Sequence, residues 1–268
     1  MFLKWMVRQL RSGDSWKEEG AVRRLARWCP KRAVPVLAQF IEPLRDSWAQ
    51  RMAIEALGKA GTAEAIDALA KAMHRTDRSH SAVAAHALES MDWSPATPGD
   101  RAAYAVALGD YDAAVDLGAI AVEPLCGTLR GQRLVAAARA LGRIGHASAV
   151  PSLLDAMGVG SVPLRQACCQ ALGSAGDPSV IDKVLAWVAD ERLASVAVEA
   201  LASILSRHVH DVDPGALRLL AVLPNPVGRS WRVTTTGEWV YEASVAAPVD
   251  ASHVRELAGR ELTIRGTE

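Results

Sequence analysis

The sequence has few of the features that mark disulfide-rich, membrane-spanning or exported chains. Its four cysteines include no C-x-x-C pair, so we expect no disulfide framework and a reducing compartment. No apolar run is long enough to span a bilayer. The first eleven residues place Lys4, Arg8 and Arg11 among apolar side chains and lack a small-residue cleavage site, which argues against a signal peptide. These absences predict a cytoplasmic protein.

Catalytic motifs are missing as well. The chain contains no phosphate-cradling glycine loop, no G-x-S-x-G elbow and no H-E-x-x-H pair. We therefore expect a protein that is not an enzyme and that needs no cofactor and no metal ion. A site assembled only in three dimensions, from residues far apart in the sequence, stays open as an alternative.

Phenylalanine is scarce, with two residues in 268, whereas alanine is abundant. Alanine favours closely packed helices, and aromatic or β-branched residues favour strands. Half of the residues are hydrophobic and 22% are charged, which is typical of a folded chain with a sizeable core. The composition therefore predicts an all-α fold.

One phrase recurs along the chain. Residues 54–73 read IEALGKAGTAEAIDALAKAM and residues 138–157 read ARALGRIGHASAVPSLLDAM, and the two are identical at nine of twenty positions. Residues 169–188, CQALGSAGDPSVIDKVLAWV, are a third copy. A leucine that ends each alanine-rich helix recurs at intervals near 30 residues, with one longer interval, at Leu25, Leu57, Leu88, Leu141, Leu172 and Leu201. Such a period predicts an α-solenoid of about six helical repeats.

Glycines punctuate each copy for two different reasons. Gly58 and its equivalents lie on the apolar face, where the absence of a side chain lets the next helix approach closely. Gly61, Gly145 and Gly176 follow the helix, and we expect each to end it in the left-handed conformation. Asp177 and Pro178 then supply an N-cap and a first-turn proline for the next helix.

The phrase Arg-x(5–6)-Ala-Leu-Gly-x-x-Gly, followed by Ala-Val-Pro-x-Leu, resembles HEAT repeats of the short bacterial type, which also occur in phycobilin lyases. Arg51 and Arg165 stand at the start of the Leu-Gly helix, as that pattern has them. The irregular stretch around Trp93 and Tyr104 resembles a module interleaved in such proteins. The resemblance covers roughly residues 20–223 and implies a binding scaffold more than any particular activity.

The N-terminal segment, residues 1–32, is strongly basic. It carries nine Lys or Arg against three Asp or Glu, a net charge of +6, so the rest of the neutral chain carries −6. The segment either caps the solenoid or forms a basic amphipathic helix for an acidic partner or an anionic membrane surface. The two interpretations are compatible.

Tryptophans crowd into the same region. They either fill a gap at the end of the solenoid or anchor a partner, since tryptophan is enriched at binding hot spots. Together with nearby arginines they form our predicted partner-binding set: Trp5, Arg8, Trp16, Arg23, Arg24, Arg27, Trp28, Trp48 and Arg51.

The repeat pattern ends before residue 224. We expect residues 1–223 to form the solenoid and residues 224–268 a small α/β appendage, with a hairpin around Gly237, a helix over HVRELAG and a last strand over ELTIR. The alternative is an extended arm that docks on another chain.

Two groups of polar residues are weaker candidates. His208, His210, Asp211 and Asp213 are potential metal ligands, but helix-end and N-cap roles explain them equally well. His74, His80 and His86 flank one loop, and the three aspartates in GDYDAAVDLG suit caps and solvated faces. We expect none of them to form a catalytic or metal site.

The sequence therefore predicts a non-enzymatic scaffold or adaptor. Its concave helices and its basic, Trp-rich end would hold a protein partner, which the charge of that end suggests is acidic. A HEAT-like DNA glycosylase or nucleic-acid-binding protein is one alternative, disfavoured because the rest of the chain is net acidic. A phycobilin-lyase-like or chaperone role is the other, and it rests on the resemblance alone.

Overall fold

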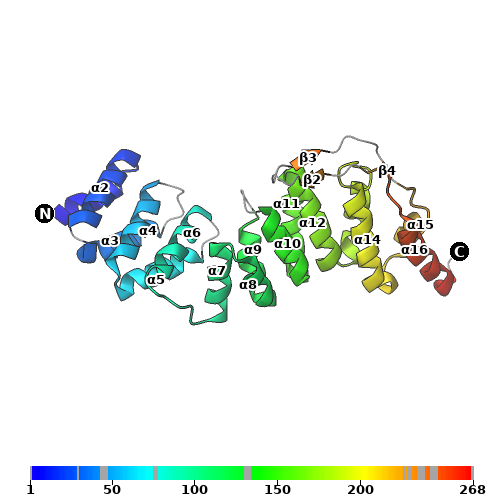
Figure 1. The fold of residues 1–268 in the computed structure, drawn as a ribbon, viewed down its shortest axis with the longest axis horizontal. Helices are drawn as coiled ribbons and strands as arrows, with labels where there is room; N and C mark the ends of the chain where they lie inside the picture. Colours follow the sequence, from blue (N-terminus) through cyan, green and yellow to red (C-terminus); the bar gives the residue numbers. More distant parts are fainter. Residues whose placement is uncertain are drawn as a thin grey trace. The chain divides into compact units, whose positions relative to one another are not determined.

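The structure is a computed structural model, and it describes residues 2–28, 30–42, 48–74, 78–129, 134–225, 227–228, 231–233, 239–241 and 247–266. Contacts divide the chain into two compact units, Met1–Thr128 and Leu129–Glu268. Each unit is a stack of α-helices joined by turns (Figure 1). The predicted all-α repeat solenoid is confirmed in both.

Helices make up the described part of the first unit: α1 (Phe2–Leu10), α2 (Ser15–Trp28), α3 (Pro30–Ile41), α4 (Trp48–Ala60), α5 (Ala63–Met73), α6 (Arg78–Glu89), α7 (Pro98–Leu108), α8 (Tyr111–Asp116), the 3-10 helix η1 (Gly118–Ala121) and α9 (Val122–Gly127). Alternate helices pack in two rows, α2 against α4 and α4 against α6, and α3 against α5 and α5 against α7. Leu25, Leu57 and Leu88 are fully buried in the first row. The spacing of the leucines is therefore the stacking period of the helices.

The irregular stretch of this unit is built around a well-capped helix. Thr97 and Asp100 form a capping box at the start of α7, each side chain accepting a hydrogen bond from the other's backbone N–H. The Trp93 and Tyr104 rings meet edge to face, with centroids 5.6 Å apart, and both pack against the core. Trp93 therefore packs against the core of the first unit.

The second unit continues the pattern: α10 (Leu134–Ile144), η2 (Ala147–Ala149), α11 (Val150–Val159), α12 (Val162–Ala175), η3 (Pro178–Val180), α13 (Ile181–Trp187), α14 (Ala194–His208), η4 (Val209–Asp211), α15 (Pro214–Ala221), β1 (Val227–Gly228), β2 (Trp231–Val233), β3 (Trp239–Tyr241), β4 (Ala247–Pro248) and α16 (Ser252–Arg265). In this unit α10, α12, α14 and α16 form one row, each packing against the next.

The glycine of each Leu-Gly pair lies where successive helices come closest. In every case the facing residue is the alanine that directly precedes the leucine of the next repeat. Glycine and alanine therefore bring the helix axes closer than larger residues would. A Cβ added to the glycine would lie 2.9 Å from an atom of that alanine in each pair: Gly58 on Ala87, Gly142 on Ala171 and Gly173 on Ala200.

The glycines at the helix ends are of two kinds. Gly61 and Gly145 have φ of +60° and +65°, the left-handed conformation that was predicted. Gly176 has φ of −74°, so the left-handed prediction is wrong there. Its reason is space, because a Cβ on Gly176 would collide with the carbonyl oxygen of Leu172.

The predicted small α/β appendage is not seen, because its last helix packs into the helical stack. The strands on either side of the predicted hairpin turn do pair, and Gly237 itself lies outside the described residues. The strands described after α15 have two or three residues, with β1 antiparallel to β4 and β2 to β3. The segment ELTIR, predicted as a strand, belongs to α16, which packs against α15 and α14. Val254, Ala258 and Leu262 are buried at four-residue steps. This helical stripe outweighs the β-branched residues of ELTIR.

Candidate functional site

Trp5 forms an exposed aromatic–cation pair between the first two helices. α1 buries Met6 and Leu10 in the core, at 0% and 2% exposure, and leaves Trp5 at the surface with 47% of its area exposed. The guanidinium carbon of Arg24 in α2 lies 5.6 Å from the centroid of the Trp5 ring, within cation–π range. The structure therefore brings two residues of the predicted set together.

Trp16 and Trp48 occupy the same place in successive repeats. They are 32 residues apart, as Leu25 and Leu57 are, and they lie in the first turns of α2 and α4, which pack against each other. Their exposed fractions are 85% and 60%. The guanidinium carbon of Arg51 lies 5.4 Å from the Trp48 centroid. Neither side chain fills the core, so the gap-filling interpretation is wrong for both.

Two arginines of the predicted set form ion pairs within their own helices. Arg23 Nη2 lies 2.5 Å from Glu19 Oε1, and Arg51 Nε lies 3.7 Å from Glu55 Oε1. Pairs at this spacing on an exposed helix contribute only about 0.3–0.5 kcal/mol. The charge of Arg23 is thus partly neutralised by Glu19, whereas the guanidinium of Arg51 also lies over the Trp48 ring.

The remaining members of the set are dispersed. Arg27 is exposed near the end of α2, Arg8 faces a separate hollow, and the side chain of Trp28 lies outside the described part of the structure. The set is therefore two aromatic–cation pairs, an exposed tryptophan in register with one of them, and arginines that stand over no described tryptophan ring.

A hollow of about 580 Å³ between α1 and the start of α2, called here the basic hollow, is lined by four cationic side chains: Lys4, Arg8, Arg11 and Lys17. Arg11 Nη2 donates a hydrogen bond to Gln39 Oε1 at 3.1 Å, and Lys17 Nζ lies 2.9 Å from Asp14 Oδ2. Lys4 and Arg8 have no ion pair or hydrogen bond with any described residue. Of the four, only Arg8 belonged to the predicted set, although the helical spacing of residues 4, 8 and 11 placed them on one face.

Asp14 contacts Lys17, which lines the basic hollow, and also caps α2. The Lys17 ammonium holds the pKa of Asp14 below its usual value, aided by the backbone N–H groups of Lys17 and Trp16. Trp16 N lies 3.1 Å from Asp14 Oδ1, so the carboxylate caps the helix that carries the exposed tryptophan.

The family model of HEAT repeats matches residues 3–90 and 133–203, which is more than half of the chain. The chain belongs to the HEAT-repeat family. The unmatched residues between the two ranges include the irregular stretch around α7, α8 and α9. No curated protein sequence matches the chain.

Three solved structures that the chain resembles are each less than 25% identical to it. The chain is 18% identical to human deoxyhypusine hydroxylase in complex with glycerol, over 75% of this chain and 84% of that one, with a TM-score of 0.35. It is 20% identical to the CpcE–CpcF complex of phycocyanin lyase from Nostoc sp. PCC7120, over 81% and 91%, with a TM-score of 0.31. It is 17% identical to a designed armadillo repeat protein, over 97% and 98%, with a TM-score of 0.31. No activity transfers to this chain on likenesses of this size.

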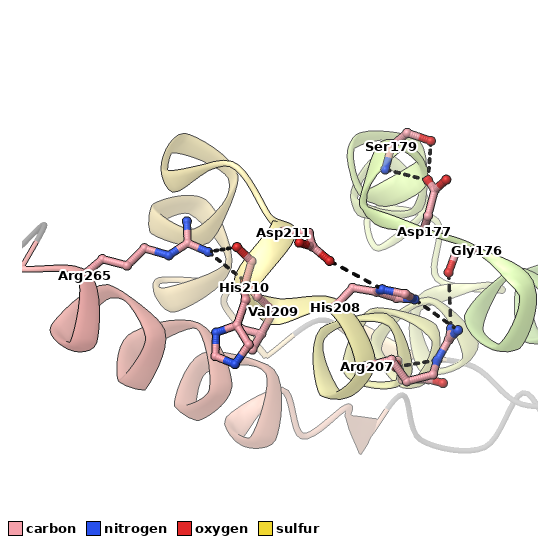
Figure 2. Close-up of polar contacts among 10 residues, drawn as sticks. Gly176, Asp177, Ser179, Arg207, His208, Val209, His210, Asp211 and Arg265 are labelled. Carbon is pink, nitrogen blue, oxygen red and sulfur yellow. Dashed lines mark hydrogen bonds and ion pairs between the residues drawn. The ribbon is translucent and has the colours of Figure 1, made fainter.

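His208 at the end of α14 faces Asp211 of η4, whereas His210 points away from both (Figure 2). His208 Nδ1 lies 3.8 Å from Asp211 Oδ2, whereas His210 Nδ1 lies 2.9 Å from Glu261 Oε2 on α16. Asp213 caps α15 by accepting hydrogen bonds from two backbone N–H groups. Across the residues that the structure describes, no three His, Cys, Asp or Glu side chains form a group that could hold a metal ion.

Arginines join successive HEAT repeats in the same region (Figure 2). Arg207 on α14 donates to the carbonyls of Gly173 and Gly176 at the end of α12. Arg265 on α16 donates to the carbonyls of Val209 and Val212, at 3.1 and 2.9 Å. Each arginine satisfies carbonyls that the end of the preceding helix leaves unpaired. The polar residues here therefore serve the stacking of the repeats.

Glu261 completes this junction from inside α16. Its carboxylate is buried beside His210 and lies 2.7 Å from Arg265 Nε. Hydrogen bonds from His210 and then from Arg265 hold the pKa of Glu261 below its usual value. α16 is thus held in place by the ion pairs of Glu261 as well as by its buried apolar residues.

The three histidines near α5 and α6 do not converge. His74 Nε2 lies 2.7 Å from Asp100 Oδ1, His80 is buried, and His86 Nδ1 lies 3.2 Å from Glu89 Oε2. Hydrogen bonds from Thr97 and then from His74 lower the pKa of Asp100. The His74–Asp100 contact links the end of α5 to α7, whereas the His86–Glu89 pair lies within α6.

The two adjacent cysteines of α12 are fully buried thiols. Cys168 and Cys169 have no exposed area, and burial raises the pKa of each to about 12. A thiol must ionise to act as a nucleophile, so both are unreactive near neutral pH. Cys126 is half-buried, and Cys29 lies outside the described residues.

Among the described helices, none is long and apolar enough to cross a membrane.

Proposed function

We propose that this HEAT-repeat chain is a non-enzymatic scaffold that holds a protein partner at the N-terminal end of its first unit. One observation carries the proposal: Trp5, Trp16 and Trp48 are all exposed, and arginines stand over two of their rings. Large aromatic side chains and arginines are the residues most enriched at binding hot spots.

Burial of these side chains would supply much of the binding energy. A tryptophan buries roughly 150–250 Å² when a partner covers it, and at about 25 cal/mol per Å² several kcal/mol of favourable transfer energy follow. A guanidinium already held over the ring costs less side-chain entropy when the interface forms. The pairs of Arg24 with Trp5 and of Arg51 with Trp48 are therefore preorganised anchors.

A protein partner fits this surface better than a membrane or a nucleic acid. A helix that lies on a membrane needs its apolar face free, but α1 buries Met6 and Leu10 in the core. A nucleic acid needs cations along its whole path, but residues 33–128 hold seven Lys or Arg against thirteen Asp or Glu, a net charge of −6.

The test is capture of partners by the full-length chain from a lysate of its native cells, with identification by mass spectrometry. Wild type and the double variant Trp16→Ala/Trp48→Ala serve as baits, and Leu219→Ala/Val222→Ala is the matched control. All four side chains are more than half exposed, so neither variant should disturb folding. Circular dichroism checks that helicity is unchanged.

We expect one set of proteins to be captured by wild type and by the control and to be lost at least tenfold from the tryptophan variant. Equal capture by all three baits would overturn the proposed location of the site.

A further inference from the structure

Three hollows join along α1, α3 and α5. The basic hollow shares Val7 and Arg11 with a second hollow of about 390 Å³. The second shares Gln39 and Glu42 with a third, of about 520 Å³, between α3 and α5. Because neighbouring hollows share lining residues, they adjoin one another within the first unit, and the row of three is called here the graded groove.

The chemistry of the graded groove changes from end to end. At the α1 end the lining is cationic, as described above. In the middle it is apolar, with Val7, Leu10, Val36 and Phe40. At the α5 end the described lining residues are mostly anionic, with Glu42, Glu64 and Asp67 beside the cation Lys71.

The charges at both ends are available to a ligand. Lys4, Arg8, Glu42, Glu64 and Asp67 are exposed, and none has an ion pair or hydrogen bond with any described residue. Charges that are not already paired within the protein gain most from a complementary partner.

The sequence shows the same separation of charge. Residues 1–32 carry +6 and residues 33–128 carry −6, so the first unit is neutral only as a sum. The second unit has fourteen Lys or Arg and fourteen Asp or Glu without such a division. The graded groove crosses the boundary between the basic and acidic parts of the first unit.

We infer that the graded groove binds an extended protein segment that is acidic at one end, apolar in the middle and basic at the other. The inference rests on the proposed scaffold function and names the chemistry of the partner. Packed helices lie about 10 Å apart, so the path from α1 to α5 is about 20 Å. At about 3.3 Å per residue, roughly six extended residues span it.

A lipid surface does not match this pattern. The basic hollow alone would attract anionic head groups, but the carboxylates at the α5 end would repel the same surface. A bipolar peptide satisfies both ends at once.

The experiment measures binding of three fluorescent peptides to the full-length chain by anisotropy at low and at physiological salt. The peptides are EEELLLKKK, EEELLLEEE and KKKLLLKKK. We expect EEELLLKKK to bind at least tenfold more tightly than either uniform peptide, and added salt to reduce the difference.

Variants at each end test the polarity of the graded groove. Glu42→Lys/Asp67→Lys should shift the preference to EEELLLEEE, and Lys4→Glu/Arg8→Glu should shift it to KKKLLLKKK. Glu42 follows α3, and Asp67 lies beyond the first turn of α5, so neither lysine opposes a helix dipole. Asp155→Lys/Glu199→Lys in the second unit is the control, with the wild-type preference expected.

The inference is overturned if wild type binds EEELLLEEE as tightly as EEELLLKKK, if it binds none of the peptides at millimolar concentration, or if the charge-reversed variants keep the wild-type order. Tighter binding to phosphatidylserine vesicles than to EEELLLKKK would also overturn it. These outcomes are separate from the capture experiment. If capture depends on Trp16 and Trp48 while the peptides fail, the scaffold function stands and only the graded groove is wrong.

Discussion

Residues 54–73 in the first unit and residues 138–157 in the second share nine of twenty side chains, and nearly all of the shared ones stack helices. One shared position holds the glycines of close approach, Gly58 and Gly142, and another holds Gly61 and Gly145, which end a helix in the left-handed conformation. Six shared positions are buried in both copies: Ala56/Ala140, Leu57/Leu141, Ala65/Ala149, Leu69/Leu153, Ala72/Ala156 and Met73/Met157.

Most of the positions at which the two copies differ are at least partly exposed, although buried Ile54 corresponds to buried Ala138. Glu64 and Asp67 of α5, at the anionic end of the graded groove, correspond to Ser148 and Pro151 in the second copy. The second copy stacks without these carboxylates, so stacking does not require them. What the repeats share therefore explains the fold, and what they do not share is where function is to be sought.

The largest effect is expected at the shared leucines. Leu57→Ala and Leu141→Ala each remove a fully buried side chain, and each should lower the free energy of unfolding by about 3–5 kcal/mol. Urea denaturation followed by circular dichroism measures both. Similar decreases in the free energy of unfolding would support equivalent packing roles for the two leucines. A decrease below about 1 kcal/mol at either position would contradict that equivalence.

The glycines of close approach come next. Gly58→Ala and Gly142→Ala would each push a methyl group against the facing alanine, at a cost of about 1–3 kcal/mol. Gly142→Ala should cost more, because its new Cβ meets backbone atoms of Ala171. Gly20→Ala in α2 is the control: nothing lies within 4 Å, so we expect a gain of about 0.5–1 kcal/mol. A Gly142 variant as stable as the Gly20 variant would contradict close approach.

The stability of the second unit should depend on pH through Glu261 of α16. A lowered pKa means that the folded state favours the charged carboxylate. That stabilisation is present above the unfolded pKa, about 4.3, and is lost as pH falls through the lower folded value. The difference in Tm between wild type and Glu261→Gln should therefore be largest near pH 6 and narrow toward about pH 3. A constant difference would contradict the role of the carboxylate, and the exposed Glu256→Gln serves as control.

The smallest effects on stability are expected at exposed apolar residues. Trp16→Ala and Val159→Ala, with 85% and 90% of the native side chains exposed, should each change the free energy of unfolding by less than about 0.5 kcal/mol. A loss above about 1 kcal/mol at Trp16 would show that this tryptophan is a structural cap and not a binding anchor.

Much of the fold could be predicted because its signals are local. The leucine period, Gly58 and the left-handed Gly61 and Gly145 each follow from a few neighbouring residues. The sequence predicts a strand over ELTIR because a five-residue segment with Thr and Ile is typical of strands. Over a longer window, Val254, Ala258 and Leu262 show the four-residue step of a helix.

The candidate site was less predictable because it depends on contacts between distant residues. The sequence named Trp16 and Trp48, and their 32-residue spacing matches that of the leucines, yet only the structure shows that both are exposed. The graded groove joins residues of α1, α3 and α5, and the pairing of His210 with Glu261 crosses 51 positions. No local pattern indicates either one.

The most direct test of the division between stacking and binding is site-specific photo-crosslinking in the native cell. A photoreactive residue replaces exposed Ser15, beside Trp16, or exposed Val159 in the second unit. We predict a defined crosslinked partner from position 15 and none from position 159. Crosslinking to the same partner from position 159 alone would contradict a binding surface at the N-terminal end of the first unit.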